Sequence, residues 1–128
     1  MKYLLDTHTF LWFLTDDKRL SNRAKGIIED INNIIFLSSA SVWELSIKSS
    51  IGKIKFLVSL EEIISTAMNV YDFKHLPITI QHSLEVAKLP LHHKDPFDRV
   101  LIAQARVENM VVITCDSYMK QYDVNVIW

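Results

Sequence analysis

The sequence contains very little glycine, proline or cysteine. Its 128 residues include two glycines, three prolines and a single cysteine, Cys115. So few turn-forming residues argue against long linkers and disordered segments, and one cysteine cannot form an intramolecular disulfide. The chain also lacks an excess of basic residues, since its formal net charge is -1. A protein that binds nucleic acid through its overall charge is far more positive, so such binding here requires a local patch or a metal ion.

The sequence also lacks an apolar segment long enough to cross a bilayer. Asp6 and His8 interrupt the first apolar run too early for a signal peptide. We therefore expect a cytoplasmic protein with no membrane segment. Of the 128 residues, 49% are hydrophobic and 23% are charged, which is a globular composition. We expect a single domain that spans residues 1–128.

Short apolar runs alternate with helical patterns along the whole chain. Runs without internal alternation are typical of buried parallel strands, and they occur at residues 2–5, 34–37, 70–73, 110–114 and, at an edge of the sheet, 124–127. Apolar spacing and capping residues predict helices at about residues 8–14, 21–32, 42–48, 59–68, 79–87 and 96–105. The pattern predicts an α/β fold: a three-layer α/β/α sandwich with a parallel sheet of four to five short strands.

The stretch from residue 92 to residue 105 turns abruptly from a polar loop into an apolar helix. Asp95 suits the N-cap of that helix, and Pro96 suits its first position. Asp98 then falls in the first turn, near the positive end of the helix dipole. Two acids at this spacing also resemble a capping box, which only stabilises a helix start. The pair therefore does not identify a functional site by itself.

Three further acids stand near the predicted ends of strands. Asp6 follows the first strand, Asp116 follows the fourth, and Glu44 lies one turn into the helix after the second. Ligands bind outside the carboxyl ends of parallel strands, so these acids and Asp98 are expected to converge at one edge. Clustered carboxylates repel one another unless a cation lies among them, and oxygen ligands suit Mg²⁺ or Mn²⁺ better than Zn²⁺. The pattern indicates metal-assisted phosphodiester chemistry. Each acid alone also has a structural interpretation, as a strand end, a solvated helix residue or a turn cap.

Other residues near this edge have two interpretations each. His92 and His93 suggest a zinc site, but adjacent histidines in a loop rarely both bind one ion. Arg99 and Lys48 are candidates for contacting an RNA backbone, although such charges are often only solvated. The apolar run from Phe10 to Leu14 is expected to be covered by a partner chain.

Four blocks of the chain together resemble the PIN-domain nucleases and, within them, the VapC-type toxins of bacterial toxin–antitoxin pairs. In the family's order they are Leu4–His8, Ser38–Leu45, Asp95–Ala105 and Ile113–Asp116. The resemblance implies an endoribonuclease that depends on Mg²⁺ or Mn²⁺. It also implies a homodimer and a cognate antitoxin whose C-terminal segment covers the active-site groove. The acidic positions of the family fall on Asp6, Glu44, Asp98 and Asp116, with Asp95, Thr7 and Thr114 in supporting positions.

Two other classes of protein remain as alternatives. A catalytically silent PIN-like module would bind RNA or protein without cleaving it. A receiver-type signalling domain also combines a parallel sheet with an acidic Mg²⁺ pocket, but it needs adjacent acids after the first strand, where this chain has Asp6-Thr7. A Mg²⁺-dependent cleavage assay with a chelator control separates a nuclease from a silent module.

Overall fold

Five parallel strands form one sheet in the order β3-β2-β1-β4-β5. The computed structural model describes all residues from 1 to 128. The central strand β1 pairs with β2 on one side and with β4 on the other, so Leu4 stands opposite both Phe36 and Val112. The strands are β1 (Lys2–Leu5), β2 (Ile34–Ser38), β3 (Lys74–Leu76), β4 (Val111–Ile113) and β5 (Val126–Ile127).

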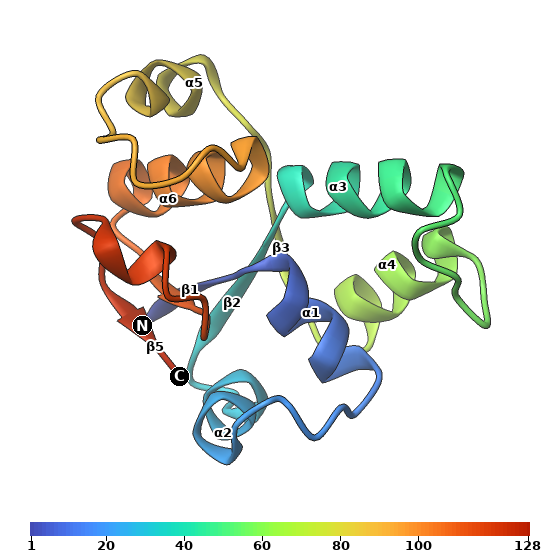
Figure 1. The fold of residues 1–128 in the computed structure, drawn as a ribbon. Coiled ribbons are helices and arrows are strands. Elements are labelled where there is room, and N and C mark those ends of the chain that lie inside the picture. Colours follow the sequence, from blue (N-terminus) through green and yellow to red (C-terminus); the bar gives the residue numbers. More distant parts are fainter.

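Helices cover both faces of the sheet, which confirms the predicted three-layer sandwich. Figure 1 shows α5 and α6 on one side of the sheet and α1 and α2 on the other. None of the helices has the length and apolar character needed to cross a membrane. The helices are α1 (Thr7–Leu14), α2 (Asn22–Glu29), α3 (Ser39–Ser50), α4 (Leu60–Asn69), α5 (Ile80–Val86) and α6 (Pro96–Glu108), with a 3-10 turn at Met119–Gln121.

The alternation of side chains along β1 divides the interior into two cores. Tyr3 and Leu5 belong to the core that includes α1 and α2, whereas Leu4 belongs to the core that includes α6. The central strand β1 is buried on both faces, because helices of this chain pack against each core. This arrangement fixes the ends of the strands, and therefore the residues that follow them.

Two residues of the apolar run in α1, Phe10 and Phe13, pack inside the chain, so the prediction that a partner covers the run was wrong for these two. Phe10 is fully buried and Phe13 is 8% exposed. Both rings contact Phe73, at centroid distances of 6.4 and 5.7 Å. The sequence shows that the run is apolar, but it does not show that α1 lies directly against the sheet.

The third strand starts later than predicted. Val70 caps the end of α4, and Asp72 has a positive φ of 57°, which breaks an extended strand. The strand itself begins at Lys74. Phe73 is nevertheless buried at 3% exposure, so the apolar residues of this stretch mark core packing in the turn before the strand.

The order of the strands places a switch point beside β1. The chain adds β2 and β3 on one side of β1, and it later adds β4 and β5 on the other side. Ligands of open parallel sheets bind at such a point, beyond the carboxyl ends of the strands. Asp6 follows β1 directly, and Asp116 follows shortly after β4.

Candidate functional site

Asp6 ends β1 and is the N-cap of α1. Its Oδ1 accepts a hydrogen bond of 2.7 Å from the backbone N–H of Thr9, and its Oδ2 accepts one from the hydroxyl of Thr114. The residue is only 5% exposed, and burial raises the pKa of Asp6 above its ordinary value. Sequence reasoning identified Asp6 as a strand end but missed its capping role, which the polar residues before the apolar run of α1 signal. The carboxylate is therefore fixed at the end of the central strand.

Thr114 joins the ends of the two central strands. It is fully buried after β4, and its hydroxyl donates to Asp6 while accepting from the backbone N–H of Asp116 at 3.0 Å. Asp116 Oδ1 in turn accepts from the backbone N–H of Tyr118 at 2.7 Å. One hydroxyl thus ties the positions of two acids that are far apart in the sequence.

Glu44 is buried on α3 at 6% exposure, so it is not a solvated helix residue. The helix begins at Ser39, after the N-cap Ser38, and so starts earlier than predicted. Glu44 Oε1 accepts from the hydroxyl of Thr7 at 2.7 Å, and Oε2 pairs with Lys48 Nζ at 2.7 Å. Thr7 therefore holds Glu44 against the start of α1. The ammonium group of Lys48, a predicted RNA contact, is engaged by Glu44 on its own helix.

Asp98 lies in the first turn of α6, whose N-cap is Asp95. Asp95 Oδ1 accepts from the backbone N–H groups of Phe97 and Asp98, at 2.9 and 3.1 Å. Asp98 Oδ2 lies 3.2 Å from His93 Nε2. Burial, followed by the negative charges of Asp95, Asp116, Asp6 and Glu44, raises the pKa of Asp98 to about 8.

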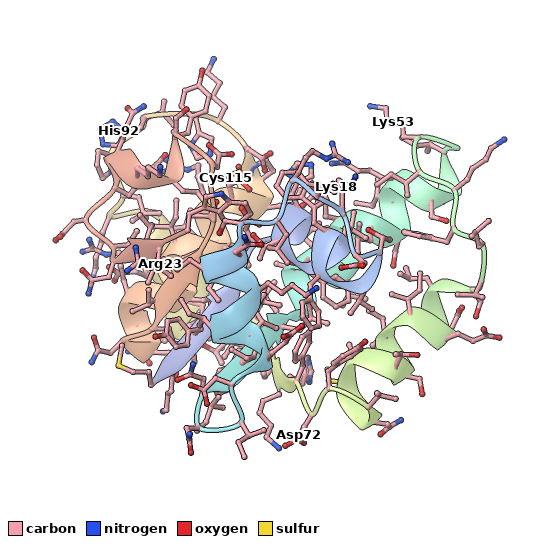
Figure 2. All side chains as sticks on the ribbon, turned by 90° about the horizontal axis from the view of Figure 1, so that it is seen from below. Lys18, Arg23, Lys53, Asp72, His92 and Cys115 are labelled. Carbon is pink, nitrogen blue, oxygen red and sulfur yellow. The ribbon has the colours of Figure 1, made fainter.

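Three of the other predicted acids act electrostatically on Asp98. Asp6, Glu44 and Asp116 come from distant parts of the sequence, yet the charge of each raises the pKa of Asp98. In Figure 2, the exposed Cys115, which precedes Asp116, lies far from Asp72 at the opposite side of the view. Asp72 precedes β3, at the amino ends of the strands.

The same edge has no ready-made coordination sphere. No group of three or more His, Cys, Asp or Glu residues is placed to hold a metal ion, so His92 and His93 do not form the zinc cluster weighed from the sequence. The acids are instead held by protein hydrogen-bond donors and by Lys48. The donor set nevertheless consists of carboxylate oxygens that repel one another, and such a set fits a hard divalent cation.

The Arg99 guanidinium forms hydrogen bonds with other groups of this chain. Its Nη1 donates to the carbonyl of Pro90 at 2.9 Å and to the hydroxyl oxygen of Tyr122 at 3.0 Å, and its Nη2 donates to the carbonyl of Val86 at 3.4 Å. These bonds tie the loop between α5 and α6 to α6. They favour a structural role for Arg99 over the RNA contact weighed from the sequence. His93 and Tyr122 complete this network, and nothing in the residue pattern had singled out Tyr122.

Comparison with known protein families gives one match that spans almost the whole chain. The sequence model described as the PIN domain matches residues 3–125. A search of curated proteins finds no match.

Solved structures with the same fold come from several bacteria. VapBC2 from Rickettsia felis, bound to a DNA fragment from its promoter, is 16% identical with a TM-score of 0.75, over 100% of this chain and 99% of that chain. VapBC-1 from nontypeable Haemophilus influenzae is 22% identical with a TM-score of 0.65, over 99% and 97% of the two chains. FitAcB from Neisseria gonorrhoeae is 18% identical with a TM-score of 0.64, over 98% and 96%. At these identities the likeness is one of fold.

Proposed function

Because the chain belongs to the PIN domain family, we propose that it is a metal-dependent endoribonuclease and the toxin of a toxin–antitoxin pair. The observation that carries the proposal is the placement of four acids, at the end of β1, on α3, at the start of α6 and after β4, where the charges of the other three bear on Asp98. Burial is the main cause that raises the pKa of Asp98 to about 8, and the negative charges of Asp95, Asp116, Asp6 and Glu44 add to it. A fold gains no stability from such crowding, so a ligand that uses it is the simplest explanation.

We propose Asp6 and Asp98 as the principal ligands of Mg²⁺ or Mn²⁺. Glu44 and Asp116 would bind the ion through water or position the attacking water. When bound, the ion lowers the pKa of that water and neutralises charge that builds up on the phosphate. Thr114 keeps Asp6 and Asp116 in a fixed relation through its single hydroxyl.

One charged pair and two hydrogen-bonding residues on this edge hold the acids in place. The Lys48 ammonium lies 2.7 Å from Glu44 Oε2, so it places a positive charge next to this buried carboxylate. Thr7 and Asp95 support the same arrangement, Thr7 by holding Glu44 and Asp95 by capping the helix that carries Asp98.

We also propose an antitoxin partner, a homodimer and a cytoplasmic location. The similar solved structures are VapBC and FitAcB assemblies, which supports a partner protein for this chain. Exposed apolar side chains such as Trp43, at 58%, and Leu84, at 65%, support further protein contacts. We propose that residues 1–128 act as a single domain, because both cores are built on one sheet.

The test is cleavage of single-stranded and structured RNA by the purified protein in Mg²⁺, in Mn²⁺ and in EDTA. Wild-type protein should cut only with a divalent ion, and Asp98→Asn should not cut at all. Asp72→Asn is the matched control, because Asp72 lies at the other end of the sheet with its side chain 83% exposed. A folded wild-type protein that never cuts RNA would support the silent module. Equal cleavage by Asp98→Asn would reject the assigned site.

The toxin role has a separate test. Induced expression should arrest bacterial growth, and co-expression of the small protein encoded next to it should restore growth. The Asp98→Asn protein should be harmless at the same expression level. Arrest by this variant would show that growth inhibition does not come from the carboxylate site.

A further inference from the structure

His93 lies between Asp98 and the buried Tyr122. Its Nδ1 lies 2.8 Å from the Tyr122 hydroxyl, and its Nε2 lies 3.2 Å from Asp98 Oδ2. The imidazole is stacked on Tyr118, with ring centroids 5.2 Å apart and planes 7° from parallel, and its side chain is 10% exposed. The ring is thus held on its face and on both nitrogens.

The partners of the Tyr122 hydroxyl determine which imidazole nitrogen carries the proton. Its oxygen accepts from Arg99 Nη1 at 3.0 Å and from the backbone N–H of His93 at 3.3 Å. A guanidinium and a backbone N–H cannot accept, so the hydroxyl proton must be donated elsewhere, and His93 Nδ1 is the acceptor in reach. With Nδ1 accepting, the ring proton lies on Nε2, which donates to Asp98 Oδ2.

This chain of hydrogen bonds uses only one oxygen of Asp98. No side chain or backbone group bonds to Oδ1, which leaves that oxygen available for an external ligand. Because Nε2 carries the proton, His93 has no lone pair there to bind an ion itself. His93 therefore orients the Asp98 carboxyl group and does not bind the ion alongside it.

We infer that His93 is a positioning residue for Asp98: the Arg99–Tyr122–His93 chain fixes the tautomer that orients the Asp98 side chain through Oδ2, so that Oδ1 is presented to a divalent cation. This inference rests on the proposed function. Hydrogen-bond partners of metal-binding carboxylates orient them, and their loss typically weakens metal affinity by about 10- to 100-fold. A merely structural loop network would instead change stability and leave metal affinity unchanged.

The first experiment measures Mn²⁺ affinity by electron paramagnetic resonance, without RNA. His93→Leu should weaken binding by about 10- to 100-fold, whereas His93→Gln, whose amide N–H replaces the Nε2 donor, should bind within a few-fold of wild type. His75→Gln is the matched control, because His75 is an exposed histidine on β3 and lies outside the Arg99–Tyr122–His93 chain. Urea unfolding of each protein shows whether it is folded.

The second experiment records ¹⁵N NMR of the imidazole in metal-free protein. We expect His93 protonated at Nε2 and unprotonated at Nδ1, and we expect Tyr122→Phe to lose this fixed tautomer. If His93→Leu does not fold, Tyr122→Phe takes its place in the Mn²⁺ titration, with weaker binding expected.

Two results separate this inference from the proposed function. Equal Mn²⁺ binding by wild type and His93→Leu, or a proton on His93 Nδ1, would overturn the positioning role alone. A folded wild-type protein that binds no Mn²⁺ would overturn the proposed function, and the positioning role with it.

Discussion

Replacing Asp98 with asparagine should stabilise the metal-free protein even though it abolishes cleavage. Burial and neighbouring acids raise the pKa of Asp98 from 3.8 to about 8. Between these values the folded state holds a proton that the unfolded state has released. The stability of the wild type therefore falls as pH rises from about 4 to about 8, and this contribution is flat above that range. Asparagine has nearly the same shape and no charge, so the variant lacks this fall.

The size of the effect follows from the pKa difference, at about 1.4 kcal/mol per unit. At pH 5 the pH lies about 1 unit above 3.8, so the gain for Asp98→Asn has a ceiling of ~2 kcal/mol. At pH 8.5 the full shift of about 4 units sets a ceiling of ~6 kcal/mol. The side chain is 19% exposed, so solvent screens the charge. We therefore expect roughly half of each ceiling, or ~1 and ~3 kcal/mol.

The assay is urea unfolding of wild type and Asp98→Asn in EDTA at pH 5 and pH 8.5. The variant should be the more stable protein, and its advantage in free energy of unfolding should grow by ~2 kcal/mol between the two pH values. The other titrating groups are the same in both proteins, so their contributions to the difference in free energy of unfolding largely cancel. Asp72→Asn should show no such growth, because Asp72 is exposed. A variant less stable than wild type at pH 8.5, or a constant difference, would refute the electrostatic description of the site.

Three further predictions concern the ion and the residues that hold the site. Mg²⁺ or Mn²⁺ at 100 times its dissociation constant should stabilise the wild type by ~2.7 kcal/mol and raise its melting temperature in calorimetry; an unchanged melting temperature contradicts the site. Thr114→Val leaves Asp6 and the Asp116 N–H without their shared partner. The free energy of unfolding in urea should fall by ~1–3 kcal/mol, and cleavage should be slower. A variant as stable as the wild type would show that this hydroxyl is dispensable. Arg99→Met should lower the free energy of unfolding by ~2 kcal/mol, because the carbonyls of Val86 at the end of α5 and of Pro90 in the next loop lose a charged donor. The salt dependence of RNA binding, measured by fluorescence anisotropy, should not change, and a slope lower by about one would place Arg99 on a phosphate.

The sequence predicted the layers of the fold because buried parallel strands and capped helices leave strong local patterns. The continuous apolar runs at β1, β2 and β4 could not form half-exposed strands, and Ser59 and Asp95 marked helix starts. The error at β3 arose where Phe73 is buried in a turn, since local patterns do not distinguish a buried turn from a strand. The packing of Phe10 was missed for a related reason, because it depends on where α1 lies in three dimensions.

The candidate site was predictable where chemistry and topology coincide. Asp6 and Asp116 follow neighbouring strands of the sheet, and that placement follows from parallel topology alone. The hydrogen bond from Thr7 to Glu44 was not predictable, because it depends on how closely α3 approaches α1. The contacts of His93 were equally hidden, since its partner Tyr122 comes 29 residues later.

The central claim is that carboxylates from separate parts of the chain bind one divalent cation at the carboxyl edge of the sheet. Anomalous diffraction from crystals grown with Mn²⁺ tests this claim most directly. We predict a manganese peak roughly 2 Å from an oxygen of Asp98 and from an oxygen of Asp6 or Asp116. A manganese peak held elsewhere, or none at this edge in a folded protein, would contradict it.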